Sequence, residues 1–168
     1  MWTRIEQGID LLALVGRNQE IRQFACWVAR QTNIADSADR KLVDNIARYT
    51  KFPDYIDKYC ERLRARQRGK AIAATAVGLN HGCISAREYL CCLSCASPDP
   101  KDAATVTINH AVAWYQQVTR LEDADPFLEL IATNLTRCGM KEAFCRGRLQ
   151  GGLQLHTTIK LTINWGPV

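Results

Sequence analysis

The sequence lacks any apolar run approaching the roughly 20 residues that a helix needs to cross a bilayer. Its first ten residues, MWTRIEQGID, have neither the basic start nor the long apolar centre of a secretion signal. No stretch rich in proline, glycine and serine divides the chain in two. We therefore expect a soluble, cytoplasmic protein without a membrane partner. Its 168 residues, 47% of them hydrophobic, are enough to bury the core of one domain.

The sequence motifs of common catalytic sites are also missing. There is no GxGxxG or GxxxxGK[ST] for nucleotide phosphates, no HExxH for zinc, and no GxSxG for a nucleophilic serine. The carboxylates of Asp99 and Asp125 stand at helix starts, where capping accounts for them. Pairs such as Cys83 with His110 carry no local sign of an activated thiol. We expect neither enzymatic activity nor a cofactor.

Eight cysteines are present, and without a secretion signal they are expected to be buried apolar side chains rather than disulfides. One group resembles a metal site: His81, Cys83, Cys92 and Cys95. The Cys92-x-x-Cys95 spacing suits tetrahedral zinc, but both thiols fall inside a predicted helix, where zinc knuckles are unusual. We favour thiols buried at a helix interface, and the zinc site is the alternative.

Helix-like periodicity begins near the N-terminus. We expect a first helix that starts at Thr3, where Glu6 completes a capping box, and that ends at Gly16. A second helix is capped by Asn18. Its inward face carries apolar residues at i, i+3, i+4 and i+7: Ile21, Phe24, Ala25 and Val28.

Two further helices are expected between residues 36 and 70. Asp36 or Ser37 caps the first of them, which ends near Pro53. The next helix starts at Pro53 and closes on a basic run that ends at Lys70.

The stretch from Lys70 to Val118 predicts three close-packed helices at the centre of the fold, because each piece is rich in small side chains. The first is alanine-rich, the second is capped by Ser85, and the third begins with Asp99 and a proline. Residues 104–108 also alternate like a short strand, which is a competing interpretation. A last helix is expected to start at Asp125 and stop at Gly139, and a further turn or two over Met140 to Phe144 is the alternative.

From Leu153 to Trp165, apolar and polar residues alternate strictly, which predicts a β-strand. No second strand is evident. This strand would therefore pair with a misread segment, with another copy of the chain or with a partner's sheet. The expected fold class is mainly α: a single-domain multi-helix bundle over residues 1–150 with one C-terminal β-strand. Residues 151–168 would complete that domain or form an arm that pairs with a partner.

Positive charge is concentrated in the first 70 residues. The chain has a net charge of +5, and this part holds 14 basic and 9 acidic residues, against 8 of each beyond it. The basic run consists of Arg62, Arg64, Arg66, Arg68 and Lys70. On a helix these residues divide into 62/66/70 on one side and 64/68 on another. A solvated helix end explains the run, and a patch for phosphates or for an acidic protein is the alternative.

Exposed tryptophan and arginine side chains are common anchors of protein interfaces. Trp27 lies at the edge of the apolar face of its helix, so it is either a residue of the core rim or a partner anchor. The candidate partner-binding residues are Trp27, Trp114 and the four arginines of the basic run.

Three segments together resemble the all-helical immunity-protein family of bacterial polymorphic toxin systems: IRQFACWVARQT, ADSADRKLVDNIARYT and AIAATAVGLN. The resemblance covers about residues 18–118. The residues that match the family's first two elements are Phe24, Ala25, Cys26, Asp39, Arg40, Leu42 and Val43. The resemblance implies a cytosolic bacterial protein that binds and occludes a protein toxin. With a net charge of +5, that toxin would present an acidic or neutral contact surface.

Two other functions remain open. A small basic regulator could bind nucleic acid through the run from Arg62 to Lys70. A structural module could instead assemble through the strand from Leu153 to Trp165.

Overall fold

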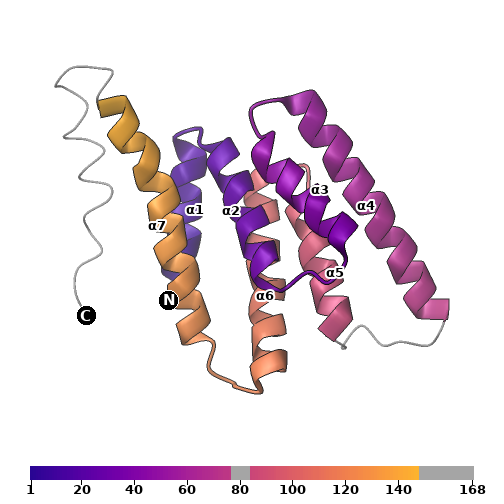
Figure 1. Cartoon of the computed structure of the whole chain (residues 1–168). Coiled ribbons are helices and arrows are strands. Elements are labelled where there is room, and N and C mark those ends of the chain that lie inside the picture. Colours follow the sequence, from indigo (N-terminus) through magenta and orange to yellow (C-terminus); the bar gives the residue numbers. More distant parts are fainter. Residues whose placement is uncertain (77–83, 148–168) are drawn as a thin grey trace.

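The computed structural model describes the backbone of residues 1–76 and 84–147, and the side chains of residues 1–70, 72, 73 and 87–138. In this part of the chain all regular structure is helical (Figure 1). The helices are α1 (Trp2–Leu14), α2 (Asn18–Gln31), α3 (Ser37–Arg48), α4 (Pro53–Ala76), α5 (Ile84–Cys95), α6 (Pro100–Thr119) and α7 (Asp125–Gly147). The mainly α fold is confirmed. The strand predicted over Leu153–Trp165 lies outside the described residues, as does the division at residue 151.

Helix α2 is the centre of the bundle. It packs against α1, α3, α5, α6 and α7, and Figure 1 places α7 and α1 on one side of it and α4 on the other. The predicted inward face of α2 is confirmed, because Ile21, Phe24, Ala25 and Val28 are all fully buried. Burial of such side chains is the main stabilising term of the fold.

The predicted three-helix centre is only partly right. Helices α5 and α6 do pack closely on each other and on α2, with small buried residues such as Ala104 and Ala111 at the contact. The alanine-rich segment, in contrast, belongs to the end of α4, which contacts α3 and α5 at one side of the bundle. Ile72 is 72% exposed there. Alanine content therefore does not place this segment at the centre.

Several predicted helix boundaries are confirmed by their capping geometry. The Asp36 carboxylate accepts hydrogen bonds from the backbone N–H groups of Ala38 and Asp39 at the start of α3. Asp99 accepts one from Asp102 at the start of α6, whose first residue is a proline. Gly16, after α1, has φ +75°, a conformation that glycine adopts without strain.

Other boundaries differ from the prediction. Helix α4 continues through the basic run to Ala76, and α7 continues past Gly139 to Gly147. A glycine inside a helix costs only about 1 kcal/mol, so packing on neighbouring helices can override it. Helix α1 begins at Trp2 without a side-chain cap, so the predicted capping box does not form. Residues 104–108 are helical.

A buried arginine joins α2 to the end of α5. The guanidinium of Arg22 donates from Nη1 to the carbonyls of Cys95, at 3.2 Å, and Ser97, and from Nη2 to the carbonyl of Pro98 at 2.7 Å. The last carbonyls of a helix have no partner within the helix and carry partial negative charge. Arg22 therefore acts as the C-terminal cap of α5 and fixes α5 against α2.

We expect Arg22→Met to lower the free energy of unfolding by about 2–4 kcal/mol, because one buried and two partly buried carbonyls lose a charged donor. Urea unfolding followed by circular dichroism measures this. Arg68→Met is the matched control, since Arg68 is exposed on α4, and it should change stability by less than about 0.5 kcal/mol. Equal effects of the two substitutions would contradict the capping role.

Candidate partner-binding surface on the α3–α4 hairpin

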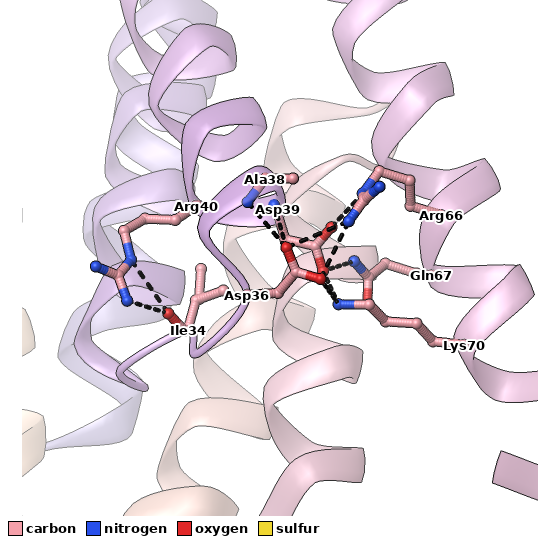
Figure 2. A network of polar contacts seen from close by, with 8 residues as sticks. All are labelled: Ile34, Asp36, Ala38, Asp39, Arg40, Arg66, Gln67 and Lys70. Carbon is pink, nitrogen blue, oxygen red and sulfur yellow. Dashed lines mark hydrogen bonds and ion pairs between the residues drawn. The ribbon is translucent and has the colours of Figure 1, made fainter. Parts of the chain in front are cut away.

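Two acidic residues at the start of α3 meet three donors from one turn of α4 (Figure 2). Asp39, whose side chain is 2% exposed, accepts hydrogen bonds from Arg66 Nε at 2.6 Å, from Gln67 Nε2 at 2.6 Å and from Lys70 Nζ. Asp36 pairs with Arg66 Nη2 at 3.0 Å and with Lys70 Nζ at 2.7 Å. We call these five residues the Asp36/Asp39 network.

The network keeps both carboxylates ionised. Burial raises the pKa of Asp39, but hydrogen bonds from Lys70, Arg66 and Gln67 outweigh this and leave the pKa below its ordinary value. The hydrogen bond from Lys70, followed by that from the backbone N–H of Asp39, holds the pKa of Asp36 far below its usual range. Burial lowers the pKa of Lys70, and its bonds to Asp36 and Asp39 more than reverse that shift.

The network divides the basic run. Arg66 and Lys70 lie on the side of α4 that faces the start of α3, as the 62/66/70 grouping predicts. The predicted explanation of the run as a helix end is wrong, because α4 continues to Ala76. Arg62 and Arg68 are exposed and Arg64 is half-buried. Among the residues that the structure describes, none of these three arginines makes a hydrogen bond or an ion pair. They are the members of the run that remain available to a partner.

Four aromatic residues gather where α3 turns into α4, and we call them the aromatic corner: Tyr49, Phe52, Tyr55 and Tyr59. Tyr49 stacks on both Tyr55 and Tyr59, with ring centroids 5.7 Å apart in each pair. Phe52 meets Tyr55 edge to face at 6.1 Å. Phe52 is 55% exposed and Tyr55 is 52% exposed. The rings of Phe52 and Tyr55 are therefore exposed to solvent while they pack against neighbouring aromatic rings.

The aromatic corner was not among the sites predicted from the sequence. At this point of the chain only the end of one helix near Pro53 and the start of the next were predicted. The available signal was four aromatic residues spaced three or four positions apart across a predicted turn, which brings them onto one side of a helical hairpin.

Neither tryptophan proposed as an anchor is fully exposed. Trp27 is half-buried and stacks on Phe24, with centroids 6.2 Å apart and planes at 14°, so its ring lies on the core rim. Trp114 on α6 is half-buried, and its indole Nε1 is buried beside Glu88 of α5. Burial raises the pKa of Glu88, against the effect of the Trp114 N–H. These two rings contribute mainly to packing between helices.

The thiols of Cys92 and Cys95 lie in the core, 1% and 0% exposed. The Cys95 thiol donates to the carbonyl of Cys92 at 3.3 Å, and burial raises the pKa of Cys92 to about 12. The other two zinc candidates, His81 and Cys83, lie outside the described residues. Among the residues that are described, no group of three His, Cys, Asp or Glu side chains is placed to hold a metal ion.

Comparisons with protein-family models, with curated proteins and with solved structures found no match to this chain. Within residues 1–76 and 84–147, no helix is both long and apolar enough to cross a bilayer. Geometry and charge on the α3–α4 hairpin must therefore carry any assignment of function.

We expect Asp39→Asn to lower the free energy of unfolding at pH 7 by about 3 kcal/mol, because breaking one partner of a buried ionic network leaves the others unpaired. Folding lowers the pKa of both acids, so their contribution is complete above the ordinary value of 3.8 and is lost as the pH falls below it. The difference between wild type and Asp39→Asn should therefore shrink between about pH 5 and pH 2.

The control for this experiment is Asp44→Asn. Asp44 pairs with Arg30 at 3.2 Å, but Asp44 is exposed and Arg30 is only half-buried, so the loss of this pair should cost less than about 1 kcal/mol. A difference between wild type and Asp39→Asn that stays constant from pH 7 to pH 2 would show that the carboxylate charge of Asp39 is not what stabilises the hairpin.

Proposed function

We propose that this chain is a non-catalytic interaction protein of the cytoplasm that binds a protein toxin and occludes its active surface. The observation that carries the proposal is the aromatic corner, where Phe52 and Tyr55 are more than half exposed beside one another. Aromatic side chains are enriched in the central, energetically dominant parts of protein interfaces. A protein that acts by occlusion needs such a surface and needs no catalytic residues.

The stacking within the corner supports this use. Because Tyr49 packs against both Tyr55 and Tyr59, the rings are held in place before any partner arrives. Side chains that are already ordered lose less conformational entropy on binding, so more of the contact energy becomes affinity. The corner also belongs to the segment, residues 18–118, that resembles the immunity-protein family.

Nucleic-acid binding is the second candidate, and one observation favours it. Arg62, Arg64 and Arg68 are cations without an ion pair in the described structure, and they lie on the same helix as two tyrosines of the corner. Single-stranded nucleic acids bind where basic side chains and stacking rings alternate. The proposal of self-assembly rests on Leu153–Trp165, which lie outside the described residues.

The proposed function is tested by capturing the partner with the tagged chain in the cells that make it. The captured protein is then produced in a host that lacks it, with and without the chain. We expect the partner to arrest growth when produced alone, and wild-type chain to restore growth. The double substitution Phe52→Ser, Tyr55→Ser should abolish the rescue at equal protein level, because the exposed rings of the interface are lost.

Leu14→Ser is the control, because Leu14 is an exposed apolar residue far along the chain from the corner, at the end of α1, and is 83% exposed. This variant should rescue growth like wild type. A captured protein that does not impair growth, or recovery of nucleic acid instead of protein, would contradict the proposed function.

A further inference from the structure

We propose that the aromatic corner and Arg62 form one docking stripe for an acidic segment of the partner protein, with a carboxylate of that segment at the Arg62 guanidinium. This inference rests on the proposed function and specifies the chemistry of the partner at the same surface.

Helix geometry places the parts of the stripe in line. Tyr55, Tyr59 and Arg62 stand at i, i+4 and i+7 on α4, so their side chains follow one another along a single face. Phe52 and Tyr49 extend that face across the turn through their ring contacts with Tyr55. The stripe thus offers exposed rings at one end and, at the other, an exposed arginine that has no ion pair among the residues the structure describes.

The Asp36/Asp39 network determines where the stripe carries free charge. Arg66 and Lys70 continue the same face at i+11 and i+15, but both are bonded to Asp36 and Asp39. Two bases against two acids cancel, so among the described residues the free positive charge of this face is that of Arg62, joined by the exposed Lys58 one turn before it. A carboxylate that approaches the stripe is therefore attracted to the edge formed by Lys58 and Arg62, within one turn of Tyr59.

The same charges favour an acidic protein segment over a nucleic acid. Tight phosphate binding depends on many cations, because affinity grows with the number of phosphates neutralised. Among the described residues of α4, the stripe and its edge offer two free cations, Arg62 and Lys58. The same helix carries exposed carboxylates at Asp54, Asp57 and Glu61. Around the helix axis these carboxylates are about 80° or more from Tyr55, Tyr59 and Arg62, so a narrow segment along the stripe avoids them. A polyanion that also reached Arg64 and Arg68 would have to pass close to these carboxylates.

The first test replaces Phe52 with the photoreactive residue p-benzoylphenylalanine in the full-length chain, inside the cells that make the protein. Illumination should join position 52 to a protein, and mass spectrometry of the adduct should locate the attachment in a segment rich in Asp or Glu. Chains carrying the same residue at Leu14 or Leu121, which are exposed elsewhere, should give no adduct with that protein.

The second test titrates the identified segment, as a synthetic peptide, with purified wild-type chain and two charge variants. Arg62→Gln should weaken binding about tenfold and reduce its dependence on salt, because a charge-assisted contact is lost. Arg68→Gln removes the same charge from another side of α4 and should change affinity less than twofold. Circular dichroism verifies that both variants keep the helical fold.

The outcomes separate this inference from the proposed function. Adducts only at positions 14 or 121, or equal effects of Arg62→Gln and Arg68→Gln, would overturn the docking stripe and leave a protein-binding function intact. A nuclease-sensitive adduct at position 52 would overturn both in favour of nucleic acid. The absence of any adduct at all three positions would also overturn both.

Discussion

The buried carboxylate of Asp39 is the constraint on which the α3–α4 hairpin depends. An ionised group with 2% exposure is tolerated only when hydrogen bonds replace its lost hydration, and here three donors from a single turn of α4 do so. Because those donors are Arg66, Gln67 and Lys70, α4 has one favourable position along α3. At the other end of the hairpin, that position lets Tyr49 of the turn meet Tyr55 and Tyr59. The Asp36/Asp39 network at one end of the hairpin therefore fixes the arrangement of the aromatic corner at the other end.

A second polar contact anchors the rest of the bundle. Arg22 of the central helix α2 caps α5, and α5 in turn packs against α4 and α6. The hairpin is thus attached to a core whose helices are joined by burial and by directed hydrogen bonds. The cations used in these contacts are unavailable to a partner. The cations of α4 that are exposed and have no ion pair among the described residues are Lys58, Arg62 and Arg68. The sequence alone does not separate them from Arg66 and Lys70.

Features encoded by neighbouring residues were predictable. The inward face of α2 follows from the spacing of Ile21, Phe24, Ala25 and Val28, and the cap at Asp36 follows from residue type. The ion pairs of Asp39 with Arg66 and Lys70 were not predictable, because they join residues about 30 positions apart and depend on how two helices pack. The aromatic corner was missed because its residues belong to two helices and a turn, and only the hairpin brings them together.

The turn of this hairpin and the first turns of α4 form the surface that we propose for the partner. Amide hydrogen exchange of the chain, alone and in its complex, tests this most directly, because binding slows the exchange of covered backbone groups. We predict slower exchange across residues 49–62 in the complex, with little change at residues 11–16 and 118–124. Slower exchange at those two regions, with residues 49–62 unchanged, would contradict this prediction.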